Sequence, residues 1–386
     1  MTIEDPLVHF RGAFPSENLN ARRLAAALEA PGCDRRTLLD ASAVNLEKLG
    51  ALVTGDKKDR QSPFAITRGN QFEDRVTGEG MALLLALASE HLGLTIPEAR
   101  QEDLSAGNVK EEFPGLQGEP LNKRRTLLTR QRVKTMLSDP AAAKNLLRHA
   151  MTTIDFGGKP AYLEQDALAF AVGGRIHVAE IKSFARIDGR ADPAKASATV
   201  RQTAVYVLSL QNLVEDFGAS RDVVDTRVLI VLPENLSFNA TGVVVDTEMQ
   251  VRRLRRQLAE VPRVVDVFEA MPPGVTLPAL PASTSQDDLH SAQKTAREAL
   301  SHIPARFGEG CVSCPLFKWC RGEAEKQGSI SRLGNAVAAT CAGVTTISAA
   351  LEFAGGRRQP GNASEAAVAA MLARSSAAMA HAVNGR

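Results

Sequence analysis

The chain of 386 residues has no long apolar run and little net charge. No apolar stretch reaches the ~20 residues that a membrane-spanning helix needs. The opening residues, MTIEDPLVHFRG, lack the apolar core of a secretory signal, so we expect a cytoplasmic protein. Because the formal net charge is only +2, any nucleic-acid-binding surface has to come from local clusters of basic residues.

Two further features are missing or scarce. The sequence contains no Walker-type phosphate loop, which excludes a helicase motor in this chain. It contains only 5 cysteines, and in a reducing compartment so few argue against a disulfide framework. Their clustering towards the end of the chain indicates a metal site instead.

The stretch YLEQDALAFAVGGRIHVAEIKSF, residues 162–184, predicts two strands joined by a tight turn at Gly173-Gly174. Asp166 is placed near the start of the first strand. Glu180 and Lys182 are two residues apart on the second strand and therefore share a face. Two carboxylates can hold a hard cation, and an ammonium group can orient or polarise an attacking water. A surface hairpin with a solvated Glu–Lys pair would have the same spacing.

This arrangement resembles the catalytic core of the PD-(D/E)XK nuclease superfamily, in its RecB-like branch, where an acidic residue, a short hairpin and Glu-x-Lys follow one another. The resemblance implies that Asp166, Glu180 and the main-chain carbonyl of Ile181 hold Mg²⁺ or Mn²⁺, while Lys182 acts on the water. Glu164 is a reserve ligand, because its spacing from Asp166 predicts the same strand face. The implied reaction is metal-assisted hydrolysis of a phosphodiester.

The segment ITRGNQFEDRVTGEG predicts a helix that starts at Gly69-Asn70, with Phe72 and Val76 as an apolar pair beneath Glu73. It resembles the first motif of RecB-like nucleases, in which a helix carries a Glu or His beside the metal, and so implies Glu73 as a further ligand. A surface glutamate in a first helical turn fits the same pattern. His149 is the competing candidate, in a segment, NLLRHAMTTIDF, that indicates a helix leading into a strand.

After the hairpin, DPAKASATVRQTAVYVLSLQNLV predicts an amphipathic helix on which Gln202 and Tyr206 share a face. A Q-x3-Y helix directly after Glu-x-Lys is typical of the RecB-like branch. The resemblance implies that these side chains contact DNA and support the metal site. An ordinary helix with a partly buried tyrosine is the alternative. The segments TRVLIVLP and TGVVVDT predict two more strands.

Three cysteines follow a C-x2-C-x5-C spacing: Cys311, Cys314 and Cys320. Three thiolates are one short of what a [4Fe-4S] cluster or a structural zinc needs. AddB-type recombination nucleases and CRISPR-associated RecB-like exonucleases have this spacing after the core and one cysteine before it, so the resemblance implies a [4Fe-4S] cluster that Cys33 completes. Zinc fits less well, because zinc sites usually pair two C-x2-C motifs. Cys341 lies outside the pattern and is expected to be a free thiol.

Two basic stretches are candidates for DNA contacts, since non-specific DNA affinity is mainly electrostatic. The denser one contains Lys123, Arg124, Arg125, Arg130, Arg132 and Lys134. The weaker one is the predicted helix VRRLRRQLAEV, with Arg252, Arg253, Arg255 and Arg256. Solvated helical faces would give the same pattern.

We therefore expect an α/β protein with a restriction-endonuclease-like core, a mixed central sheet flanked by helices, and a helical iron–sulfur lobe. The expected segments are an N-terminal helical part with the first cluster cysteine (1–60), the RecB-like core (61–245), a helical and iron–sulfur cluster region (246–345) and an Ala-rich tail (346–386).

The implied function is that of a Mg²⁺- or Mn²⁺-dependent DNA nuclease in repair or recombination, CRISPR adaptation or phage defence. Its implied partners are DNA and a helicase or a defence-complex protein, with no membrane. A non-catalytic DNA-binding or complex-forming subunit with the same fold is the alternative, although the intact Asp/Glu-x-Lys set argues against it.

Overall fold

The computed structural model describes residues 5–56, 63–95, 99–165, 168–235, 237–281 and 285–384. The chain divides into two compact units. The first comprises Met1–Glu17, Ala26–Lys58 and Val261–Arg386, and the second comprises Asn18–Ala25 and Asp59–Glu260. Within the described ranges, none of the helices combines the length and apolarity that a membrane crossing requires.

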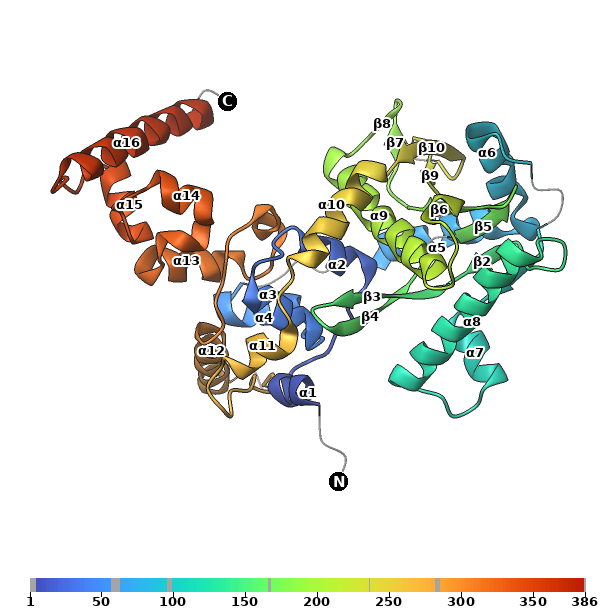
Figure 1. Ribbon diagram of the computed structural model, residues 1–386, viewed down its shortest axis with the longest axis horizontal. Helices are drawn as coiled ribbons and strands as arrows, with labels where there is room; N and C mark the ends of the chain where they lie inside the picture. Colours follow the sequence, from blue (N-terminus) through green and yellow to red (C-terminus); the bar gives the residue numbers. More distant parts are fainter. Residues whose placement is uncertain are drawn as a thin grey trace. The chain divides into compact units, whose positions relative to one another are not determined.

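A six-stranded mixed sheet forms the centre of the second unit, with the strand order β1-β2-β5-β6-β9-β10 (Figure 1). Its strands are β1 (Gln101–Asp103), β2 (Leu146–Arg148), β5 (Leu168–Val172), β6 (Arg175–Ile181), β9 (Val224–Pro233) and β10 (Ala240–Asp246). The pairs β1–β2 and β6–β9 are parallel, and the other neighbouring pairs are antiparallel. The mixed central sheet is therefore confirmed.

Helices cover both faces of this sheet. Helices α5 (Pro63–Thr77) and α6 (Ala82–Leu92) pack on the face that carries Ala179 of β6 and Leu229 of β9. Side chains alternate along a strand, so Val178 and Glu180 point to the opposite face. Helix α9 (Pro193–Glu215) packs against β6 and β9 and covers that second face (Figure 1).

Smaller elements complete the second unit. They are η1 (Glu79–Met81), α7 (Ala106–Glu112), α8 (Gly118–Ser138), η2 (Arg221–Val223), α10 (Glu248–Ala259) and the two-stranded sheets β3 (Met151–Phe156) with β4 (Lys159–Glu164) and β7 (Arg186–Ile187) with β8 (Arg190–Ala191). Helix α10 lies in this unit because Val251 and Leu254 are buried and Arg255 bonds Gln211 of α9 at 2.9 Å. The second compact unit therefore continues to Glu260, past residue 245.

The turn between β5 and β6 follows from its two glycines. Val172 pairs with Arg175, so only Gly173 and Gly174 connect the strands. Both have a positive φ, at 60° and 75°, which glycine adopts without a steric cost. The predicted position of the turn is correct.

Three predictions about local structure are wrong. Helix α5 already begins at Pro63 rather than at Gly69, as suits a proline, whose missing N–H costs nothing in a first helical turn. The first strand expected from residue 162 is divided between two sheets. Residues up to Glu164 belong to β4, which pairs with β3 in a separate sheet, and β5 of the central sheet begins at Leu168. The segment before His149 forms β2 instead of a helix, since it pairs with β1 and β5.

The first unit is built from helices. They are α1 (Pro6–Arg11), α3 (Asp34–Ala41), α4 (Leu46–Thr54), α11 (Val264–Glu269), α12 (Gln286–Ser301), η3 (Glu309–Ser313), α13 (Phe317–Gln327), η4 (Ile330–Leu333), α14 (Asn335–Thr340), α15 (Ile347–Ala354) and α16 (Ala363–Asn384). Helix α2 (Ala21–Leu28) contains residues of both units. Leu38, Leu49 and Leu300 belong to the main apolar core of the first unit, whereas Phe353 and Val368 belong to a separate cluster around α15 and α16.

Candidate functional site

Glu180 and Lys182 lie at the carboxyl end of β6. The Glu180 side chain is 0% exposed, and Lys182 Nζ lies 2.5 Å from its Oε1. The Lys182 N–H donates to the Val231 carbonyl at 3.0 Å, which extends the β6–β9 pairing beyond Ile181. A buried carboxylate is costly unless a cation compensates its charge, and Lys182 supplies one. The two side chains share a face, as their spacing predicts.

Asp166 lies outside the described residues, so its role stays a prediction. The described chain on both sides of it is anchored. The Gln165 N–H donates to the Ala150 carbonyl at 2.8 Å, and Leu168 pairs with Ala179, the residue before Glu180. These anchors place the start of β5 beside the end of β6.

Gln202 and Tyr206 form a buried pair on α9. The Gln202 amide donates from Nε2 to Tyr206 Oη at 3.0 Å, and Tyr206 is 1% exposed. A side chain this buried does not reach a phosphate backbone in this conformation, so its burial gives no support to the expected DNA contact by Tyr206, which stays a prediction. The pair lies within α9, the helix that packs on β6 over the face to which Glu180 points.

Glu73 is exposed on α5, whose Phe72 and Val76 are buried against Ala179. Because α5 covers the face of β6 opposite Glu180, the sheet separates the two carboxylates. One turn before Glu73, Gly69 lies close to Ser183, since a Cβ on Gly69 would be 3.3 Å from Ser183 Oγ. Helix α5 therefore passes the end of β6, and Glu73 can approach Glu180 only around that end.

The structure also contains a carboxylate–histidine pair at the carboxyl ends of β1 and β2, the same end of the sheet at which Glu180 lies on β6. His149 Nδ1 lies 2.7 Å from Asp103 Oδ1. Asp103 ends β1, and His149 follows β2 with a φ of +50°. Strands β2 and β6 run in the same direction because each is antiparallel to β5 between them. The ends of β2 and β6 are thus two strand spacings apart, about 10 Å.

Chemically, this pair has the form of a metal-ligating histidine, whose second ring nitrogen almost always bonds a carboxylate or carbonyl. Partial burial acts to raise the pKa of Asp103, but hydrogen bonds with His149 and the Ser105 N–H outweigh it, so this pKa is lowered. Asp103 had no motif in the sequence. It becomes visible only once β1 pairs with β2.

Arg125 of α8 connects three chain segments at this end of the sheet by hydrogen bonds. Its guanidinium, 2% exposed, donates from Nε to the Leu104 carbonyl at 2.7 Å and from Nη2 to the His149 carbonyl at 3.1 Å. It also donates from Nη1 to Glu164 at 3.0 Å. These bonds favour a structural role for Arg125 over the expected phosphate contact, which stays a prediction, and Glu164 lies in a different strand and sheet from those expected of a reserve ligand.

Most of the other basic residues of α8 also have partners within the protein. The contacts are Lys123–Glu119 at 2.8 Å, Arg132–Glu102 at 2.6 Å, Arg130–Asp216 at 3.1 Å and Arg124 over the Phe113 ring at 3.8 Å. On α10, Arg252 pairs with Glu248 and Arg255 with Glu215. Nearby carboxylates offset much of the positive charge, so the structure favours solvated helical faces over dedicated DNA surfaces.

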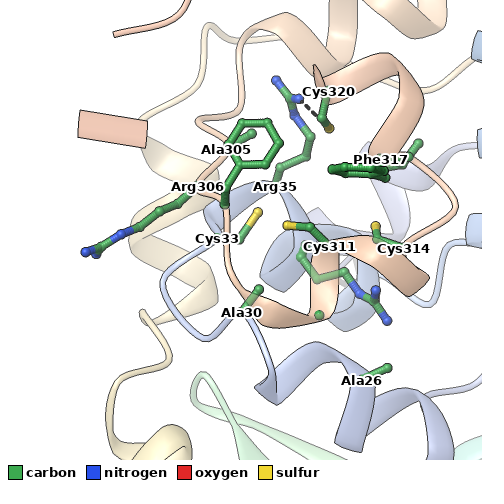
Figure 2. A pocket seen from close by; sticks show the side chains of 14 residues that line it. Ala26, Ala30, Cys33, Arg35, Ala305, Arg306, Cys311, Cys314, Phe317 and Cys320 are labelled. Carbon is green, nitrogen blue, oxygen red and sulfur yellow. Dashed lines mark hydrogen bonds between the residues drawn. The ribbon is translucent and has the colours of Figure 1, made fainter. Parts of the chain in front are cut away.

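In the first unit, Cys33, Cys311, Cys314 and Cys320 line one cavity of about 30 Å³ (Figure 2). Cys33 is the N-cap residue of α3, whereas the other three come from η3, its C-cap and α13. The fold thus brings together cysteines that are 278 positions apart in sequence (311 − 33). Cys341 is buried in the separate cluster with Phe353 and does not line this cavity.

The donor set fits a thiolate-bound metal, although the side chains do not yet stand at ligand distances. Across the described part of the chain, no three His, Cys, Asp or Glu side chains are close enough to hold an ion. Burial raises the pKa of Cys33 and Cys311, and that of Cys320 to about 12, so these thiols are neutral unless a metal displaces their protons. Four cysteines suit either a [4Fe-4S] cluster or zinc.

Hydrogen-bond donors already face two of the sulfurs. The Gly308 N–H donates to Cys311 Sγ at 3.3 Å, and Arg35 donates from Nη1 to Cys320 Sγ at 3.1 Å (Figure 2). Arg35 is fully buried and also bonds the Leu300 carbonyl at 2.9 Å and Glu323 at 3.0 Å. A buried cation next to cysteine complements the net negative charge that a metal bound by four thiolates carries.

Comparisons of the chain with protein-family models, curated proteins and solved structures give no match.

Proposed function

We propose that the chain is a metal-dependent DNA nuclease with a RecB-like, restriction-endonuclease-like core. The observation that carries the proposal is the fully buried Glu180 with the Lys182 ammonium 2.5 Å away, at the carboxyl end of a central strand. The order of elements, hairpin β5–β6, helix α9 and parallel strand β9, supports it. The Gln202–Tyr206 pair on α9, the helix that covers the face of β6 to which Glu180 points, also supports the proposal.

In this proposal, Asp166, Glu180 and the Ile181 carbonyl hold Mg²⁺ or Mn²⁺. The bound cation supplies Lewis-acid stabilisation of charge on the phosphate. Lys182 orients and polarises the attacking water, and its contact with Glu180 fixes the ammonium at the strand end. The four cavity cysteines hold a structural [4Fe-4S] cluster, with zinc as the alternative, and join the N-terminal helices to the C-terminal part of the first unit.

The test is cleavage of end-labelled single- and double-stranded DNA by anaerobically purified protein, with Mg²⁺, with Mn²⁺ and with chelator. Glu180→Gln and Lys182→Ala should each lower the rate at least a hundredfold. Glu119→Gln, at an exposed ion pair on α8, is the matched control and should cleave normally. A wild type that binds DNA but never cuts it would support the non-catalytic subunit instead, and a Glu180→Gln variant with full activity would rule out this centre.

A further inference from the structure

An open groove of about 500 Å³ lies in the first unit, apart from the cysteine cavity. Its walls come from α4, α12 and α13. The lining side chains that matter here are Thr54, Arg297, Ser301, Lys318, Trp319 and Lys326. It shares no lining residue with the cysteine cavity, and the proposed cleavage reaction does not use it.

The groove is positively charged. Arg297 is held at its wall, because both Nε and Nη2 donate to the Val53 carbonyl, at 3.0 and 2.6 Å. Lys318 is 70% exposed and pairs with the exposed Asp56 at 2.8 Å. Both members of this pair are exposed and such surface pairs are weak, so a phosphate can replace the carboxylate. Lys326 adds a third cation.

Glu323, the acidic residue of the groove lining, has little net effect on the positive charge of the groove. Glu323 accepts from Arg35 at 3.0 Å and from Arg332 at 3.0 Å. Two guanidinium groups therefore offset its single negative charge. The groove keeps an excess of positive charge, which favours an anionic ligand.

The aromatic member of the lining is Trp319, the single tryptophan of the chain. The Arg35 guanidinium lies 4.5 Å from the centre of its ring, so a buried residue holds the ring in place. An aromatic ring held beside exposed cations is the combination that binds single-stranded nucleic acids, with a base stacked on the ring and the backbone at the cations.

We propose that this groove binds one nucleotide unit of single-stranded nucleic acid, with its base on Trp319 and its phosphate at Lys318 and Lys326. A volume near 500 Å³ lies in the usual range of ligand sites, roughly 300–1,000 Å³. Only the choice of DNA as the natural strand rests on the proposed nuclease function. Binding itself needs nothing from Glu180, which lies in the other unit.

The test uses the intrinsic fluorescence of the full-length protein, because one tryptophan makes the emission a direct report on the groove. Titration with a short oligothymidylate in chelator should quench the emission saturably, and added salt should weaken the binding. Polyglutamate is the competing anionic ligand. The double variant Lys318→Ala/Lys326→Ala should raise the Kd at least tenfold. Lys294→Ala, at an exposed lysine of α12 outside the groove, should leave it unchanged.

Removal of the ring needs a second readout, namely the anisotropy of a labelled oligothymidylate. Trp319→Leu should weaken binding about tenfold, whereas Trp319→Phe keeps an aromatic face and should weaken it less. Unchanged affinity in the double lysine variant, or quenching by polyglutamate but not by oligothymidylate, would overturn the proposal. Normal quenching in a protein that never cleaves DNA would count against the nuclease function alone.

Discussion

His149 Nδ1 and Asp103 Oδ1 are 2.7 Å apart, at the carboxyl ends of two adjacent parallel strands. Glu180 lies at the same carboxyl end of the strands, whereas Glu73 lies on a helix that packs on the opposite face of the sheet. This geometry makes His149 a better candidate than Glu73 for the group that completes the proposed metal centre.

We therefore expect His149→Gln to lower the cleavage rate, and Asp103→Asn to reduce activity or Mn²⁺ affinity by roughly 10- to 100-fold, the usual effect of removing a partner of a ligating histidine. Glu73→Gln should have less effect. Rates measured across a Mn²⁺ titration separate weaker metal binding from slower chemistry. Loss of activity in Glu73→Gln together with a fully active His149→Gln would reverse this ranking.

Arg125 gives a prediction about stability. Arg125→Ala leaves the buried carbonyls of Leu104 and His149 without their donor, and an unsatisfied buried group costs about 1–3 kcal/mol. The free energy of unfolding should therefore fall by about 3 kcal/mol. Lys123→Ala, at an exposed position on the same helix, should leave the free energy of unfolding nearly unchanged. Urea denaturation measures both variants.

A stable Arg125→Ala variant with weaker, less salt-dependent DNA binding would instead make Arg125 a phosphate contact. Because Arg125 is buried whereas Lys123 is exposed, a DNA-binding experiment should not neutralise Lys123, Arg124 and Arg125 together. Loss of the buried Arg125 would disturb the fold and would look like loss of a binding surface.

The elements that the sequence predicted well have local signals. The Gly173-Gly174 turn needs two positive φ angles, β9 contains the continuous apolar run VLIVLP, and Gln202 and Tyr206 are one helical turn apart. Each depends on residues close together in the chain. The cysteine group needed the family resemblance, because nothing near Cys33 marks it as a partner of Cys311.

The features that were missed depend on pairing between distant segments. Asp103 meets His149 only because the three-residue β1 adds to the edge of the sheet. Arg125 lies in a dense basic stretch, and sequence alone does not distinguish a buried guanidinium from an exposed one. The division between β4 and β5 likewise depends on which strand each segment finds as its partner.

His177 predicts a pH dependence of stability. Its side chain is 2% exposed in β6, and its Nδ1 lies 3.3 Å from Asp225, which Arg227 also contacts and Arg175 approaches. Burial lowers the pKa of His177 below the ordinary value of 6.5, against the opposing effect of Asp225. The unfolded chain therefore takes up this proton first as the pH falls, so the stabilisation present above pH 6.5 is lost below it.

Urea midpoints between pH 7.5 and pH 5 measure this effect. The urea midpoint of the wild type should fall as the pH is lowered over this range. The change of midpoint with pH should be smaller in His177→Gln. Asp225 acts in a separate window. Burial would raise its pKa, but bonds from Arg227 lower it below 3.8, so its contribution is lost only at more acidic pH. Equal slopes in the wild type and the variant would assign the pH dependence to other groups.

Cys33 and Cys341 are both buried, but only Cys33 lines the cavity with the C-x2-C-x5-C cysteines. A metal bound by Cys33 and Cys311 closes a loop of 278 positions (311 − 33). Loop-closure entropy grows with the logarithm of loop length, so this cross-link stabilises the fold by roughly 5 kcal/mol before strain. Cys33→Ala should therefore lose metal and thermal stability as completely as Cys314→Ala, while Cys341→Ala keeps its metal.

Iron, sulfide and zinc per chain, measured after anaerobic purification, decide between the outcomes. About four iron and about four sulfide per chain in a brown wild type, lost in Cys33→Ala, would establish the [4Fe-4S] cluster and its fourth ligand together. Zinc in place of iron would rule out the cluster but keep the cross-link, because zinc and a [4Fe-4S] cluster are each bound by four thiolates. Full metal content in Cys33→Ala would make Cys33 an ordinary core residue, and the two parts of the first unit would then be held by apolar packing and by hydrogen bonds such as those of Arg35 to Leu300 and Glu323.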